Sequence, residues 1–190
     1  MPSLSEADRR AALQLARTAV VEAVSHRKLP EVFPREGIFA ERRGVFVTLH
    51  LGKRLQGCIG VIEANEPLGE AIVRCAASAA LEDPRFAPMK PDQLSEFNIE
   101  ISLLSILEPI APDSIEIGRH GLLIHLHTQR GLLLPQVAIE HRLTSEQFLE
   151  ETCRKAGLHR DAWRDPEARL FGFTCEVFAE GPHHEGPQTL

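Results

Sequence analysis

The hydrophobic pattern of this 190-residue chain changes period several times, and the order of those changes restricts its fold more than any other feature. Residues 4–28 carry apolar side chains at the three- and four-residue spacing of an amphipathic helix. The segments 45–51, 55–61 and 97–107 have the short apolar or alternating patterns of β-strands. Strands joined by hairpin turns and interrupted by a few helices, without a regular strand–helix–strand rhythm, predict an α+β fold with mainly antiparallel sheet.

Capping and turn residues set the expected limits of these elements. Ser3 with Glu6 fits a capping box at the start of the first helix. Pro67 suits the first turn of an alanine-rich helix that reaches about Leu81. Further expected elements are a strand at 38–41 in a hairpin with 45–51, strands at 122–127, 132–134 and 170–178, and a helix from Thr144 to Gly157.

The chain length suits one domain or two small lobes that share a core. The proline-marked segment 109–112 is the expected seam between two lobes. Residues 1–180 would then form a single domain, and residues 181–190 are expected to form a disordered tail.

Charge and hydropathy exclude several classes of partner. The net charge is −6, and no Lys/Arg cluster is longer than the pair Arg42 and Arg43. Because nucleic-acid binding draws much of its affinity from clustered cations, we expect no nucleic-acid partner. No apolar run approaches the roughly 20 residues that a membrane span needs, so we expect no membrane association.

The cysteines indicate a reducing compartment. Cys58, Cys75, Cys153 and Cys175 are far apart and form no C-x-x-C pair. Since the N-terminus also lacks the apolar core of a signal peptide, reduced thiols in the cytoplasm are expected.

Residues 55–60, Leu-Gln-Gly-Cys-Ile-Gly, are the first candidate for chemistry. Gly57 and Gly60 permit backbone conformations that other residues resist, and they let another group approach the main chain closely. Cys58 could be an exposed nucleophile or a soft metal ligand if a neighbour favours the thiolate. A small buried cysteine in a bulged strand explains the same pattern, and spacing alone favours that interpretation.

Glu100 lies on the polar side of an otherwise apolar strand, with Asn98 and Ser102. If that side faces a cleft, Glu100 could be a general base or a ligand with a shifted pKa. If it faces water, Glu100 is a solvated carboxylate, and the sequence alone favours this second interpretation.

Arg85 and Gln136 are candidate binding residues. Arg85, in the Asp-Pro-Arg-Phe segment 83–86, could bind an anionic group bidentately. It could instead tie down its own loop through Asp83 or backbone carbonyls, which is the commoner outcome. Gln136 follows Pro135 at an expected strand end, where its amide could organise a turn or contact the polar edge of a ligand.

The histidines give only a weak indication of a metal site. His125 and His127 lie on one face of an expected strand, but a third ligand would have to come from elsewhere. A solvated strand face explains them equally well, so we predict no metal site. The sequence has no P-loop, dinucleotide-binding, zincin or hydrolase-elbow pattern.

An ordered set of motifs resembles one known family. These motifs are the segments 55–60, 83–86, 97–102, 118–122, 133–138, 148–150 and 152–158. They closely resemble the AMMECR family, whose prokaryotic members are called AmmeMemoRadiSam system protein A. The resemblance runs from about residue 5 to residue 180.

This resemblance implies two unequal lobes, each with mainly antiparallel β-sheet and flanking helices. It also implies a genomic association with a Memo-like protein and a radical SAM protein. It suggests that Cys58, Arg85, Glu100 and Gln136 share a surface. The family usually carries arginine at the position of Gln56, so a cation beside the thiol is missing here. No cofactor is assigned, because iron–sulfur or SAM chemistry would belong to the associated protein.

Two functions fit these observations. The first is a partner or accessory module that docks on the Memo-like or radical SAM protein. The second is an enzyme in which Cys58 is nucleophile or metal ligand, Glu100 the acid/base and Arg85 an anion anchor. The partner module is favoured, since no catalytic constellation is recognisable and Gln56 replaces the one strong cation near the thiol.

Overall fold

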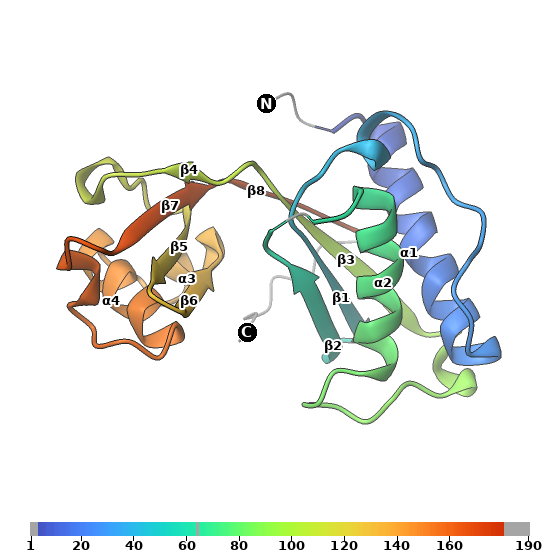
Figure 1. Cartoon of the computed structure of the whole chain (residues 1–190). Coiled ribbons are helices and arrows are strands. Elements are labelled where there is room, and N and C mark those ends of the chain that lie inside the picture. The colour runs from blue at the N-terminus through green and yellow to red at the C-terminus, as the bar shows by residue number, and fades with distance from the viewer. Residues whose placement is uncertain (1–3, 64, 181–190) are drawn as a thin grey trace. The chain divides into compact units, whose positions relative to one another are not determined.

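The computed structural model describes residues 4–63 and 65–180 of the protein. Within them the chain divides into two compact units (Figure 1). The larger unit contains the described residues up to Leu104 and those from Glu176 onward, and the smaller unit contains Ser105–Cys175. Each unit has a four-stranded sheet and its own apolar core, so the predicted α+β class is confirmed.

The larger unit packs two helices against its sheet (Figure 1). The strand order is β2-β1-β3-β8, and β1 pairs antiparallel with both of its neighbours. The elements are α1 Glu6–His26, η1 Gly37–Ala40, β1 Val45–Leu51, β2 Arg54–Val61, α2 Leu68–Leu81, η2 Pro91–Gln93, β3 Phe97–Leu104 and β8 Cys175–Ala179.

Alternation along the two central strands separates a core face from a second face. The apolar residues of one face belong to a single core cluster with the apolar sides of α1 and α2. They are Val45, Val47 and Leu49 on β1 and Ile99, Ile101 and Leu103 on β3. Since successive side chains of a strand point to opposite faces, Thr48 and Glu100 lie on the face away from this core.

The smaller unit has the strand order β4-β7-β5-β6. Its core cluster includes Phe148 and Leu149 of one helix and Leu122 of the sheet. The elements are β4 Glu108–Pro109, η3 Pro112–Ser114, β5 Gly121–Leu126, β6 Gln129–Leu133, α3 Pro135–Glu140, α4 Ser145–Lys155, η4 Ala162–Arg164 and β7 Arg169–Phe173.

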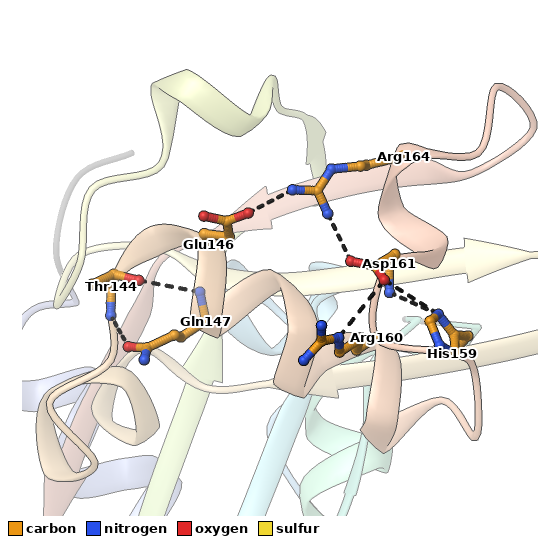
Figure 2. Close-up of polar contacts among 7 residues, drawn as sticks. All are labelled: Thr144, Glu146, Gln147, His159, Arg160, Asp161 and Arg164. Atoms are coloured by element: carbon orange, nitrogen blue, oxygen red, sulfur yellow. Dashed lines mark hydrogen bonds and ion pairs between the residues drawn. The ribbon is translucent and has the colours of Figure 1, made fainter.

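Polar contacts fasten the segment after α4 to the start of that helix (Figure 2). Thr144, where the sequence predicts that the helix begins, caps α4 in a capping box with Gln147. Arg164 donates to Oε1 of Glu146 at 2.5 Å and to Oδ1 of Asp161 at 2.9 Å. Because these side chains are exposed, each ion pair contributes at most about 1 kcal/mol to stability.

The start of the larger unit differs from the sequence-based prediction in two places. Ser3 lies outside the described residues, and α1 is capped instead by Ser5, whose hydroxyl accepts from the N–H of Asp8 at 3.1 Å. The expected strand at 38–41 is wrong, because Gly37–Ala40 forms a 3-10 helix that buries Phe39. The strand that forms a hairpin with β1 is therefore β2, which follows it in the chain.

The final expected strand, 170–178, is two strands in different sheets. β7 pairs with β5 in the smaller unit, whereas β8 lies beside β3 in the larger unit. Thr174 separates them. Its N–H donates to Oγ of Ser105 at 2.9 Å, and its C=O accepts from the N–H of Ser105 at 2.9 Å. The alternating pattern continues through this break, so the sequence gives no sign of it.

The passage between the units occurs earlier than the expected seam at 109–112. The chain enters the smaller unit at Ser105. Pro109 is already part of that unit's sheet, since β4 pairs Glu108 with Gly172 and Pro109 with Phe171. The expected tail, 181–190, lies outside the described residues.

Candidate functional site

The Asp83–Arg85 segment closes the edge of the sheet at Cys58. β2 is the terminal strand in the order of its sheet, and Cys58 pairs with Thr48 of β1 on its inner side. The N–H of Cys58 donates to Oδ2 of Asp83 at 2.8 Å, and its C=O accepts from Nη2 of Arg85 at 3.2 Å. A carboxylate and a guanidinium thus occupy the backbone groups that a further strand would otherwise bind.

Asp83 and Arg85 also hold each other in a bidentate pair. Nε of Arg85 donates to Oδ1 of Asp83 at 3.0 Å, and Nη2 donates to Oδ2 at 2.8 Å. The Arg85 guanidinium, together with N–H donors, holds the pKa of the buried Asp83 carboxyl down at about 2. The same pairing raises the pKa of Arg85. Arg85 therefore ties down its own loop and the main chain of Cys58.

The two glycines of the 55–60 motif are required by close packing. A Cβ at Gly57 would lie 2.0 Å from the carbonyl oxygen of Ala79 in α2. A Cβ at Gly60 would lie 2.3 Å from Cδ1 of Phe46. The motif thus brings β2 against the second helix on one face and against an aromatic ring of β1 on the other.

The Cys58 thiol is buried, and its pKa is raised. Its residue is 7 % exposed, and Oγ1 of Thr48 donates to its Sγ at 3.2 Å. Burial raises the pKa of the thiol, and the charges of Asp83 and Glu100 act in the same direction. The Thr48 hydrogen bond and the Arg85 charge oppose this shift of the pKa without cancelling it.

Glu100 lies in one row with Thr48 and Cys58. The register pairs Cys58 with Thr48 and Thr48 with Glu100, so the three residues cross β2, β1 and β3 on the same face. Glu100 is 6 % exposed, which overturns the expectation of a solvated carboxylate. Ser102, two residues along β3, is also buried, and its Oγ has no hydrogen-bond partner among the described residues.

Gln136 belongs to the smaller unit. It follows the end of β6, as expected, and lies in the first turn of α3, a helix that the sequence pattern did not predict. Its Oε1 is buried and accepts no hydrogen bond from the described part of the chain. The larger unit brings together Cys58, Arg85 and Glu100, whereas a surface shared with Gln136 stays a prediction.

Comparison with known proteins assigns the chain to a family. The family model described as AMMECR1 matches residues 13–178. The chain belongs to the AMMECR1 family. A protein of Methanothermobacter thermautotrophicus is 42% identical over 187 residues, which cover 93% of this chain and 96% of that protein. Protein Ta0236 of Thermoplasma acidophilum is 42% identical over 179 residues, with coverage of 89% and 85%.

A solved structure supports the same assignment. The crystal structure of the uncharacterised protein PH0010 from Pyrococcus horikoshii is similar to this AMMECR1 chain with a TM-score of 0.79. The two share 38% sequence identity over 89% of each chain.

One contact of the Cys58 thiol in this AMMECR1 chain comes from a residue that no sequence pattern indicates. Thr48 donates to the thiol, and its contact could be found only by knowing the register of β1 against β2. Gln56 is 6 % exposed, and its Nε2 donates to the carbonyl oxygen of Ala87 at 2.8 Å. This side chain therefore links β2 to the loop after α2.

The two histidines that the sequence analysis considered as metal ligands, His125 and His127, lie in the smaller unit. His125 is exposed on β5, and His127 lies in the following turn with a φ of 53°. Nδ1 of His127 is 3.4 Å from Oε2 of Glu167. Across residues 4–63 and 65–180, no three His, Cys, Asp or Glu side chains gather as a metal site would require. No helix in these same residues has the length and apolar character to span a bilayer.

Proposed function

We propose that this AMMECR1 protein is a partner or accessory module, which works in the cytoplasm with a Memo-like protein and a radical SAM protein and performs no chemistry through Cys58. The choice of partners rests on the AmmeMemoRadiSam resemblance. The single observation that carries the non-catalytic part is the state of the thiol, which is buried and has a raised pKa. A reactive cysteine needs the opposite environment, namely partial exposure and a depressed pKa.

The other groups around Cys58 also have structural roles. Arg85, the cation that could favour a thiolate, is engaged by the Asp83 carboxylate and the Cys58 carbonyl. Gly57 and Gly60 are required by packing against Ala79 and Phe46. The 55–60 and 83–86 motifs thus bind each other. This supports a protein whose preformed surface is recognised by a partner.

The chemical half of this proposal is tested by alkylation of the native protein, followed by intact mass across pH. An unperturbed thiol titrates near pH 8.5. We expect Cys58 to resist labelling at pH 6–7 and to label only on unfolding, with Cys58→Ser identifying its share of the mass increase. Fast labelling at pH 6–7 that disappears in Cys58→Ser would make Cys58 an accessible thiolate.

The partner half is tested by calorimetry with the purified Memo-like protein and the radical SAM protein of the same organism. We expect saturable binding to at least one of them, with the same affinity for wild type and Cys58→Ser. Absence of binding to both proteins would remove the partner role.

An enzyme remains the second candidate because one observation favours it. Glu100 is a buried carboxylate in the same cross-strand row as Cys58, where it could accept the thiol proton. Glu100→Gln separates the two candidates. If Glu100 acts only through its charge, the substitution should lower the pKa of Cys58 and speed its alkylation at fixed pH. If Glu100 is the proton acceptor, alkylation should slow.

A further inference from the structure

A groove of about 460 Å³ opens on the larger unit beside the start of β2. One wall is formed by residues 54–56, and the other by the loop after α2 and by η2. Sites for small ligands typically measure roughly 300–1,000 Å³, so the groove has the size of a small-molecule site.

The charges along the groove are mostly positive. Arg54, Arg85 and Lys90 line it, against the one carboxylate of Asp92. The Arg85 charge is already matched by Asp83, so the excess comes from Arg54 and Lys90. Neither of these two forms an ion pair with the described residues. This local excess is opposite in sign to the net charge of −6 of the whole chain.

Both walls of the groove are held in place before any ligand binds. The Gln56 amide is buried and reaches across to the carbonyl oxygen of Ala87 at 2.8 Å. The Arg85 guanidinium is fixed by Asp83 and lies 5.3 Å from the centre of the Phe86 ring. A site whose walls are already ordered loses less conformational entropy when it binds a ligand.

We propose that this groove binds a small molecule that carries a phosphate or carboxylate group, with Arg54 and Lys90 as the cations that contact it. Charge-assisted hydrogen bonds from such side chains are the usual means of holding these groups. The half-buried Phe86 ring supplies a flat apolar surface for the remainder of the ligand, while the Gln56 amide holds the two walls together. Binding of this small molecule is a separate proposal from the partner role, because it requires no second protein.

The test is a ¹⁵N NMR titration of the full chain at low ionic strength, first with inorganic phosphate and separately with succinate. We expect saturable shifts confined to the amides of residues 54–56 and 85–93. Arg54→Gln and Lys90→Gln should each weaken binding about 2- to 5-fold, the range for an exposed charge. Asp92→Asn should strengthen it by a similar factor.

Lys53→Gln is the charge-matched control, because Lys53 precedes the groove and does not line it. It should leave the affinity unchanged, and spectra of all variants should match wild type outside the groove. Saturation by phosphate alone supports a phosphate ligand, and saturation by succinate alone supports a carboxylate. No saturation by either anion, or equal weakening in Lys53→Gln and Lys90→Gln, would overturn the site.

Discussion

At Gly57, strand β2 approaches helix α2 so closely that no side chain fits between them. A Cβ at this position would meet the carbonyl oxygen of Ala79 at 2.0 Å, and this oxygen is part of a helix backbone that cannot turn aside. At Gly60 a Cβ would meet Cδ1 of the Phe46 ring at 2.3 Å and also the carbonyl oxygen of Val45, in the backbone of β1, at 2.6 Å. Each glycine of the motif therefore faces a backbone oxygen that cannot turn aside.

This close packing predicts a large loss of stability in both variants. Gly57→Ala should lower the free energy of unfolding by about 3 kcal/mol, because β2 must move away from α2. Gly60→Ala should lower it by a similar amount, because the Phe46 ring can rotate but the Val45 carbonyl cannot. In thermal unfolding, such a loss corresponds to a fall in Tm of about 6–12 °C. A loss below about 1 kcal/mol in either variant would contradict the assignment of its backbone oxygen as a rigid obstacle.

Thr48 is a polar neighbour whose hydrogen bond opposes the raised pKa of Cys58. Its hydroxyl donates to Sγ, and this hydrogen bond favours the thiolate. Thr48→Val keeps the shape of the side chain and removes the donor, so the pKa of Cys58 should rise further. Thiolate absorbance against pH, with Cys58→Ser subtracted, measures this change. Thr48→Ser keeps a hydroxyl and is expected to behave like wild type, and a pKa that falls in Thr48→Val would refute the role.

At the scale of elements, the loop after α2 does for β2 what a neighbouring strand would do. Its Asp83 carboxylate is buried and paired, so its folded pKa of about 2 lies below the usual 3.9 of an unfolded aspartate. Because the folded pKa of Asp83 is depressed, the ionised carboxylate stabilises the fold at pH values above its unfolded pKa. This contribution disappears as the pH falls from about 4 to about 2. The shift corresponds to roughly 2–3 kcal/mol.

Asp83→Asn should therefore flatten the acid limb of the stability curve. In urea unfolding at a series of pH values, wild type should lose roughly 2–3 kcal/mol more than the variant between pH 5 and pH 2. Arg85→Gln removes the main cause of the shift and should flatten the same limb. Parallel curves for wild type and both variants would mean that the Asp83 pair does not contribute to acid stability.

The elements that the sequence predicts well are those whose period decides between helix and strand locally. The helices α1, α2 and α4 and the strands β1, β2 and β3 follow from apolar spacing and turn residues. The errors occur where distant contacts decide the outcome. Gly37–Ala40 forms a 3-10 helix with Phe39 in the core, and the alternation of 170–178 hides its division between two sheets.

The same limit applies to the candidate site. The bond between Arg85 and Asp83 could be anticipated, because the two residues are neighbours in sequence. The attachment of both side chains to the backbone of Cys58 could not, since 25 residues separate Asp83 from Cys58. The burial of Glu100 also escaped prediction, because alternation separates two faces of a strand without showing what covers each one.

At the scale of the whole molecule, the chain passes between its two units twice, at Leu104/Ser105 and at Cys175/Glu176. Each unit has its own core cluster, and the two clusters share no residue. A substitution inside one core should therefore lower the local stability of that unit first, provided that the units open as separate cooperative regions.

Phe148→Ala tests this independence. Phe148 is fully buried in the core of the smaller unit, so its truncation should cost about 3–5 kcal/mol there. Native-state hydrogen exchange should show lost protection in Gly121–Leu126 of β5 while Val45–Leu51 of β1 stays protected. Leu103→Ala, in the core of the larger unit, should give the reverse pattern. If either variant lowered protection equally in β5 and β1, the two units would be one cooperative structure, and the division of the chain into separate cores would have no energetic meaning.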